Sequence, residues 1–201
     1  MKHLLENPAL YQLYQEIGGF HGGRVSMIRE YLDIHPGARV IDIGCGPGHI
    51  VRDLPDGIDY FGFDIDERSI TFANRHFGDR GTFSTRLFDA EAANELAGAD
   101  VVMMNGVMHH IPDTGLTETL CHIRHALRPG GWLFTADGCY TPGQSRLVKW
   151  LLDNDRGEHV RDEAGYRRLL EGVFSQVEMH VREDCSRLPY TFAIGVARNH
   201  G

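Results

Sequence analysis

Short apolar runs alternate along this chain with segments in which apolar residues recur every three or four positions. The runs are rich in β-branched and other apolar residues and lie at 39–43, 60–64, 82–88, 100–105 and 132–136. Uninterrupted runs of this length predict parallel strands that are buried on both faces. The segments between them with helical spacing lie at 49–54, 67–77 and 116–127. Strands that alternate with helices predict an α/β fold built on a doubly wound parallel sheet.

The flanking parts of the chain add helices and a final pair of strands. Helical spacing at 4–17 and 24–33 predicts two helices before the first strand. Two more helices are expected at 145–152 and 163–170. Runs at 174–181 and 190–198, joined by a short polar link, predict an antiparallel pair at a sheet edge. The pattern therefore predicts seven strands, the last of them antiparallel.

Composition narrows the class of protein. The chain has 201 residues, 42% of them hydrophobic and 24% charged, as expected for one soluble globular domain. A formal net charge of −8 argues against a nucleic-acid partner. We find no signal-peptide pattern and no apolar run near ~18 residues, so we expect a cytoplasmic protein without membrane contact. The four cysteines form no C-x-x-C pair, which leaves a zinc or redox motif unsupported.

The first strand leads directly into three glycines spaced two apart, Gly44, Gly46 and Gly48. Glycines permit a tight turn and let the backbone approach a ligand closely. A helix that begins near Gly48 points its first N–H groups at the same place. The segment therefore predicts a nucleotide-type cofactor site at the first strand–helix junction. It does not match the dinucleotide fingerprint G-x-G-x-x-G, because His49 stands where the third glycine belongs.

With Asp42 two residues before the first glycine, the segment resembles the acidic-x-Gly-x-Gly-x-Gly motif of the class I S-adenosylmethionine-dependent methyltransferases, small-molecule type. The resemblance covers residues 38–137 by motifs and the remainder by element order. It implies a Rossmann-like sheet in one domain, with a helical lid at 1–37, a cofactor-binding core at 38–137 and substrate-side helices with a terminal hairpin at 138–201. It also implies S-adenosylmethionine as cofactor, S-adenosylhomocysteine as product and a small-molecule acceptor, with oxygen the favoured acceptor atom.

Cofactor contacts are expected where the predicted strands end. Asp64 ends the second strand, 20 residues after Gly44, an offset at which a carboxylate can accept hydrogen bonds from both ribose hydroxyls. The resemblance gives Asp64 this role, and it gives Asp89 and the N–H of Ala90 the adenine contacts. For Asp89 a helix N-cap is the less favoured alternative, whereas for Asp66 the cap is the favoured interpretation. The expected cofactor-binding residues are Asp42, Gly44, Cys45, Gly46, Gly48, Asp64, Ile65, Asp89, Ala90 and Asn105.

The candidate catalytic residues are His109 and His110, which follow the fourth strand. In the family that this chain resembles, methyl group and acceptor meet at this place. A histidine has the pKa to remove a proton from an acceptor near neutral pH. The alternative is a metal site shared with Asp113 or Asp137, but that ligand set is incomplete and no metal is predicted.

Acceptor contacts are expected from the N-terminal helices and from the segment after the fifth strand. The candidates are Tyr14, His21, Tyr140, Arg146, Arg161 and Tyr166. The two arginines could hold a carboxylate or a phosphate. For each of them a solvated helix face is the alternative.

Two other functions remain open from the sequence. One is a protein of the same fold that binds S-adenosylmethionine without transferring its methyl group. The other is an NAD-dependent oxidoreductase, which His49, Asp42 and the lack of a Tyr-x-x-x-Lys pair disfavour.

Overall fold

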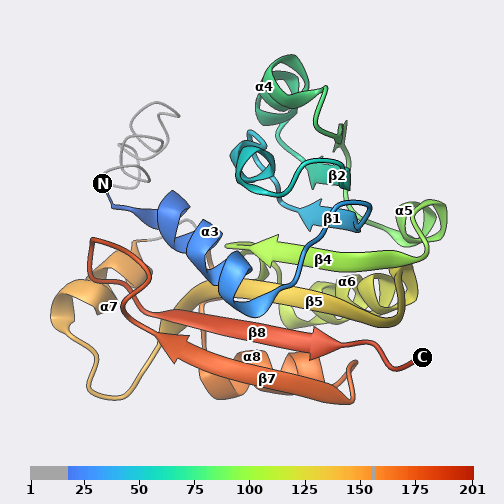
Figure 1. Cartoon of the computed structure of the whole chain (residues 1–201). Coiled ribbons are helices and arrows are strands. Elements are labelled where there is room, and N and C mark those ends of the chain that lie inside the picture. The colour runs from blue at the N-terminus through green and yellow to red at the C-terminus, as the bar shows by residue number, and fades with distance from the viewer. Residues whose placement is uncertain (1–17, 155–156) are drawn as a thin grey trace.

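The computed structural model describes residues 18–154 and 157–201. Its centre is a sheet in the order β3-β2-β1-β4-β5-β8-β7 (Figure 1). The strands are β1 (Arg39–Ile43), β2 (Asp59–Asp64), β3 (Thr82–Thr85), β4 (Ala99–Asn105), β5 (Leu127–Tyr140), β6 (Arg161–Asp162), β7 (Gln176–Arg182) and β8 (Phe192–Arg198). β1 to β5 are parallel, and β8 lies antiparallel between β5 and β7. The predicted doubly wound sheet is confirmed, with the short β6 as an additional strand that pairs only with β5.

Helices cover both faces of the sheet. They are α3 (Phe20–Tyr31), α4 (Glu67–Phe77), α5 (Ala90–Glu95), α6 (Asp113–Ala126), α7 (Arg146–Asp153), α8 (Glu163–Glu171) and the 3₁₀ turns η1 (His49–Asp53) and η2 (Met108–His110). α3, η1, α4 and α7 pack on one face, and α5, α6 and α8 pack on the other (Figure 1). Along β4, Val101 and Met103 point to the first face, while Val102 and Met104 point to the second. Burial on both faces explains the uninterrupted apolar run.

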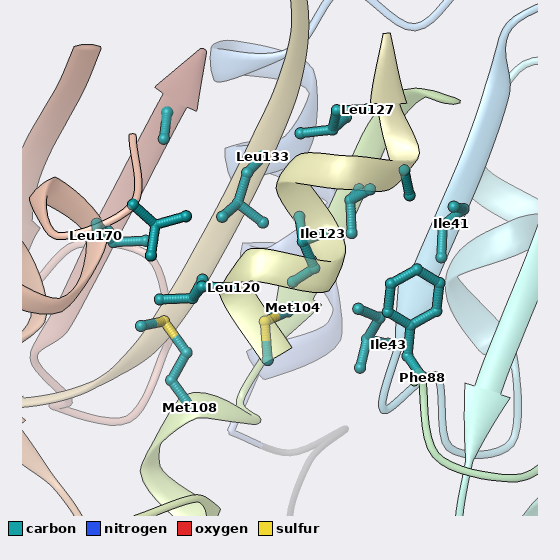
Figure 2. Close-up of a cluster of buried hydrophobic side chains, with 14 of the residues drawn as sticks. Ile41, Ile43, Phe88, Met104, Met108, Leu120, Ile123, Leu127, Leu133 and Leu170 are labelled. Carbon is teal, nitrogen blue, oxygen red and sulfur yellow. The ribbon is translucent and has the colours of Figure 1, made fainter. Parts of the chain in front are cut away.

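One of the two cores anchors the turn that follows β4. Met108 of η2 is fully buried and extends toward Leu120 of α6, close to Met104 (Figure 2). Burial of a side chain of this size contributes about 1.5–3 kcal/mol. The residues directly after Met108 are therefore held at the carboxyl end of β4.

α3 begins at Phe20, four residues before the predicted start at 24. Gly22 and Gly23 thus lie within the helix. Packing explains the glycine at position 23, since a Cβ there would collide with the carbonyl oxygen of Cys185, whereas a Cβ on Gly22 would meet no described atom within 4 Å. The helix predicted over 4–17 lies outside the described residues.

β3 and β5 differ most from their predicted bounds, while the other predicted strands match theirs within two residues, and β5 already begins at Leu127 rather than at 132. β3 ends at Thr85 rather than 88, because Phe88 turns inward and packs edge-on against Phe63 with ring centroids 5.3 Å apart. β5 continues past 136 to Tyr140, because its pairing with β8 extends through Asp137 beyond the end of β4. This extension places Asp137 at the edge where ligands bind in open α/β sheets.

Candidate active site

The glycine turn after β1 has the predicted backbone. Gly44, Gly46 and Gly48 have φ angles of 71°, 53° and 74°, a region that L-residues with a side chain adopt at a cost. The N–H groups of Gly44 and Cys45 donate to the carbonyl oxygen of Phe63 over 2.7 and 3.0 Å. These bonds hold the turn against the end of β2.

The three glycines differ in what surrounds them. A Cβ on Gly44 would collide with the side chain of Val107, and a Cβ on Gly48 would lie 2.8 Å from Phe83. A Cβ on Gly46 would meet no atom within 4 Å among the described residues. Gly44 and Gly48 are therefore required by packing, while the backbone at Gly46 is open to a ligand.

Asp64 lies beside this turn at the end of β2. Its Oδ2 accepts a hydrogen bond from the N–H of Gly46 over 2.8 Å, and its Oδ1 accepts one from the N–H of Asp66 over 2.9 Å. Each carboxylate oxygen has a second acceptor site, so both can still accept from a ribose. Asp66 is the N-cap of α4, accepting hydrogen bonds from the N–H groups of Arg68 and Ser69, as the favoured interpretation predicted.

Three further residues predicted to bind the cofactor, Ile65, Asp89 and Ala90, follow β2 and β3. Ile65 is 73% exposed and offers apolar surface there. Asp89 is exposed and caps α5, since its Oδ1 accepts a hydrogen bond from the N–H of Ala92 over 2.9 Å. This hydrogen bond lowers the pKa of Asp89. The cap leaves its second oxygen as an acceptor, with Ala90 exposed next to it.

Asp42 is the most deeply buried carboxyl of the cofactor set, with 2% of its surface exposed. Its Oδ2 accepts a hydrogen bond from Tyr60 over 2.7 Å, while its Oδ1 is buried without a hydrogen-bond partner in the described structure. Burial raises the pKa of Asp42 to about 7, against the lowering effects of the Tyr60 hydroxyl and the Arg24 charge. Arg24 lies on α3, and its Nη2 is 3.9 Å from the place of a Cβ on Gly106. Sequence reasoning missed Arg24, because an arginine on a helix resembles any solvated charge.

Asn105 ends β4 and carries a second unpaired polar group. Its side-chain Nδ2 and Oδ1 are both buried and have no hydrogen-bond partner within residues 18–154 and 157–201. Buried polar groups without partners are costly and rare, so they mark places where a polar ligand fits. The amide can bond both as donor and as acceptor.

Together these groups fit S-adenosylmethionine. Asp64 suits the ribose hydroxyls, Asp42 suits the ammonium group and Arg24 suits the carboxylate of the amino-acid part. Asn105 can bond to either kind of group. The open backbone at Gly46 leaves room for the nucleoside part.

The structure separates the two candidate histidines. His109 is 5% exposed, and its Nδ1 lies 2.7 Å from Oδ1 of Asp137. The backbone N–H of His109 donates to the same oxygen over 3.2 Å. His110 is exposed, with its ring centroid 4.2 Å from that of His109. The sequence offered Asp137 only as a possible metal ligand beside the histidines and not as a hydrogen-bond partner of His109, because the predicted fifth strand ended before Asp137.

Arg161, a candidate for acceptor binding, is fully engaged inside the protein. Its Nε and Nη2 donate to Oδ1 of Asp113 over 2.9 and 2.6 Å. Its Nη1 donates to the carbonyl oxygens of Met108 and His159, and its Nη2 also donates to that of Ile111. These bonds use all five N–H groups of a guanidinium. Acceptor binding by Arg161 therefore requires some of them to break.

The two candidate tyrosines after β5 are also bonded within the protein. Tyr166 is buried, and its hydroxyl donates to the carbonyl oxygen of Gly138 over 2.9 Å. The hydroxyl of Tyr140 donates to Asp153 of α7 over 2.8 Å. Tyr140 is half-buried, so of the two it has the more accessible ring.

The other candidates for acceptor binding are not gathered around His109. Arg146 is exposed on the first turn of α7. His21 of α3 has its Nε2 2.9 Å from Oδ2 of Asp53, at the end of η1. Tyr14 lies outside the described residues.

The described part of the chain shows neither a metal-binding cluster nor a membrane-spanning helix. No group of three or more histidine, cysteine, aspartate or glutamate side chains there is arranged to hold a metal ion. None of the helices described has the length and apolar character needed to cross a membrane.

Residues 24–173 match the model of a protein family described as a methyltransferase domain. The chain belongs to the class I S-adenosylmethionine-dependent methyltransferases. It is 29% identical over 181 residues to trans-aconitate 2-methyltransferase of Mycolicibacterium gilvum, covering 82% of this chain and 67% of the relative. It is 32% identical over 112 residues to the ubiquinone biosynthesis O-methyltransferase of Paraburkholderia phymatum, covering 52% of this chain and 47% of the relative.

Solved structures share the fold at low sequence identity. Phosphoethanolamine N-methyltransferase 2 of Haemonchus contortus, in complex with phosphomonomethylethanolamine and S-adenosylhomocysteine, aligns with a TM-score of 0.77 at 15% identity, over 100% of this chain and 59% of that one. Human N-acetylserotonin methyltransferase aligns with a TM-score of 0.67 at 20% identity, over 89% of this chain and 52% of that one. The methyltransferase thus spans about half to two thirds of the length of its curated relatives.

Proposed function

We propose that this methyltransferase transfers the methyl group of S-adenosylmethionine to an oxygen atom of a small-molecule acceptor. The observation that carries the proposal is the gathering of nucleoside-binding and proton-accepting groups at one edge of the sheet. Asp42, Asp64 and Asn105 belong to β1, β2 and β4. His109 follows β4, and its partner Asp137 lies on β5. Parallel strands bring these groups to the same edge.

Methyl transfer to a hydroxyl requires that the acceptor is oriented toward the methyl group and that the hydroxyl loses its proton. When bound, S-adenosylmethionine supplies a methyl group on a sulfonium, which is a good leaving group. The protein then has to orient the acceptor in line with that methyl group and exclude water. In this proposal His109 accepts the proton of an acceptor hydroxyl, which makes the oxygen a better nucleophile.

The choice of oxygen rests on this histidine and on the named relatives. A neutral hydroxyl gains from a base, whereas an ionised carboxylate needs none. Proteins similar to this chain include a ubiquinone biosynthesis O-methyltransferase and a mitomycin 7-O-methyltransferase, whereas the Haemonchus protein is an N-methyltransferase. The fold therefore serves several acceptor atoms, and small hydroxylated molecules are the class to test first.

Asp64→Asn tests the cofactor site. Loss of a charged acceptor costs about 1.5–3 kcal/mol, so the Kd for S-adenosylhomocysteine should rise at least about tenfold in calorimetry. Asp66→Ala is the control. Loss of its N-cap should lower stability by about 1 kcal/mol and leave the Kd unchanged. Equal affinities in the wild type and Asp64→Asn would contradict the assignment.

Transfer of labelled methyl groups to a panel of small phenols, alcohols and carboxylic acids tests the reaction itself. Labelled products among the hydroxyl acceptors support the proposal. Labelling of carboxylic acids alone would exclude a need for His109 as base. Tight cofactor binding with no transfer to any acceptor would favour the alternative of a non-methylating member of the fold.

A further inference from the structure

Asp137 and His109 form a buried pair at the carboxyl edge of the sheet. Asp137 is 1% exposed and lies on β5, one residue beyond the partner of Asn105 on β4. Its Oδ1 forms hydrogen bonds with both the backbone N–H and the ring Nδ1 of His109. Its Oδ2 is buried and has no hydrogen-bond partner in the structure described.

We propose that Asp137 is a positioning residue, which holds His109 in the tautomer with Nδ1 protonated and Nε2 able to accept the proton of the acceptor. The proposal rests on the proposed function, in which His109 is the base. It adds a residue from a different strand to the machinery, and it fixes which ring nitrogen does the chemistry.

The tautomer follows from the hydrogen bond. An ionised carboxylate can only accept, so the Nδ1 that faces Asp137 carries the hydrogen. In a neutral imidazole the lone pair is then on Nε2. The backbone N–H of His109 donates a second hydrogen bond to the same oxygen, so Asp137 fixes the position of the His109 backbone as well as that of its ring.

Packing restricts the ring further. A Cβ on Gly157 would collide with the His109 ring, so this segment lies directly against the imidazole. The N–H of His159 donates to the carbonyl oxygen of His109 over 2.9 Å. Met108, the preceding residue, is buried in the core (Figure 2). Within residues 18–154 and 157–201, the titratable and charged groups near His109 include Asp137, His110, His159, Arg161, Tyr166 and, across Gly106, Arg24.

The proton balance of the step uses the pair as a unit. The acceptor O–H bond breaks and its proton moves to Nε2 of His109, while the oxygen forms a bond to the methyl carbon. The bond from that carbon to sulfur breaks, and its electron pair stays on sulfur, giving S-adenosylhomocysteine. His109 is then an imidazolium whose charge faces the carboxylate of Asp137, and it returns the proton to solvent.

Nitrogen NMR of the protein labelled with ¹⁵N-histidine reads the tautomer without any ligand or turnover. Signals that disappear in His109→Gln belong to His109. In the wild type we expect a protonated Nδ1 and an unprotonated Nε2. In Asp137→Asn the side-chain NH₂ can donate to Nδ1, and the other tautomer should dominate. A wild-type His109 protonated on Nε2 would overturn the proposal whether or not the variant folds.

Methyl-transfer rates complete the test. Asp137→Asn should lower kcat about 10²–10⁴-fold, while the Kd for S-adenosylhomocysteine and the KM for the acceptor stay within a few-fold. Asp100→Asn is the matched control, because Asp100 lies near the other end of β4, where it bonds to Arg39 and Arg128. This control should keep both the tautomer and kcat of the wild type.

The two levels of the proposal fail in different ways. A wild-type kcat in Asp137→Asn, with its tautomer changed, would overturn the role of Asp137. A wild-type kcat in His109→Gln would instead overturn the proposed base, whatever the tautomer in the wild type.

Discussion

Asp42 is a carboxyl group that lies almost completely out of reach of water. The tyrosine hydroxyl of Tyr60 bonds to one of its oxygens, and the charge of Arg24 acts on it from α3. These effects do not offset desolvation, so its pKa rises to about 7. An unfolded chain would have this carboxyl ionised above pH ~4. The folded protein therefore binds a proton at Asp42 between about pH 4 and pH 7 that the unfolded chain has lost.

Asp42→Asn should remove a pH dependence of stability. Where the folded state binds more protons, the free energy of unfolding falls as pH rises. The wild type should therefore lose stability at this residue from about pH 4 to pH 8, by at most on the order of 4 kcal/mol. Asn can still accept the Tyr60 hydrogen bond and does not titrate. Urea unfolding without ligand should show the variant gaining on the wild type as pH rises, and parallel curves would contradict the assigned protonation.

The turn that carries the two histidines is tied to the rest of the structure at the level of elements. Arg161 on β6 bonds to the carbonyl oxygens of Met108 and Ile111 and to Asp113 at the start of α6. β6 in turn pairs with the end of β5. A two-residue strand thus connects η2, α6 and β5.

Arg161→Lys should loosen this connection. An ammonium has three donors and cannot reproduce the planar five-donor geometry, so buried carbonyl groups lose partners. We expect at least about 2 kcal/mol of lost stability in urea unfolding, given about 1.5–3 kcal/mol for one charged hydrogen bond. Arg167→Lys is the control, because its ion pairs on the surface of α8 should contribute less than about 1 kcal/mol. Equal losses in both variants would exclude a special role for Arg161.

At the scale of the molecule, the candidate site draws on residues from much of the chain. Groups from α3, β1, β2, β4 and β5 meet at a single edge, although they extend from Arg24 to Asp137 in the sequence. An unfolded chain cannot assemble them. A ligand that binds there stabilises the folded state as a unit.

S-adenosylhomocysteine should therefore raise the melting temperature. At 100 times its Kd the gain is about 2.7 kcal/mol, which for a domain of this size corresponds to roughly 5–10 °C. NAD at the same concentration should cause no shift. A melting temperature raised by NAD but not by S-adenosylhomocysteine would favour the alternative of an NAD-dependent oxidoreductase.

Local patterns were sufficient for much of the fold. Burial on both faces requires the apolar runs of β1 and β4, and the glycine turn requires residues that adopt positive φ at Gly44, Gly46 and Gly48. N-caps at Asp66 and Asp89 depend on neighbours within three residues. The apolar runs, the glycine turn and the cap at Asp66 can each be recognised within a few positions of the chain, so the sequence alone predicted them, whereas it left the cap at Asp89 as an alternative. The ligand roles of Asp64 and Asp89 stay predictions.

The tertiary structure alone decided which distant groups meet. His109 and Asp137 are separated by 28 positions, and Arg161 and Asp113 by 48. The first pair depends on β5 extending past the end of β4 along β8, and the second depends on β6 pairing with the end of β5. No periodicity or spacing records that extension, because it comes from hydrogen bonds between two strands far apart in the chain. The sequence located both histidines, whereas the packing of the sheet buried one of them against a carboxylate and left the other exposed.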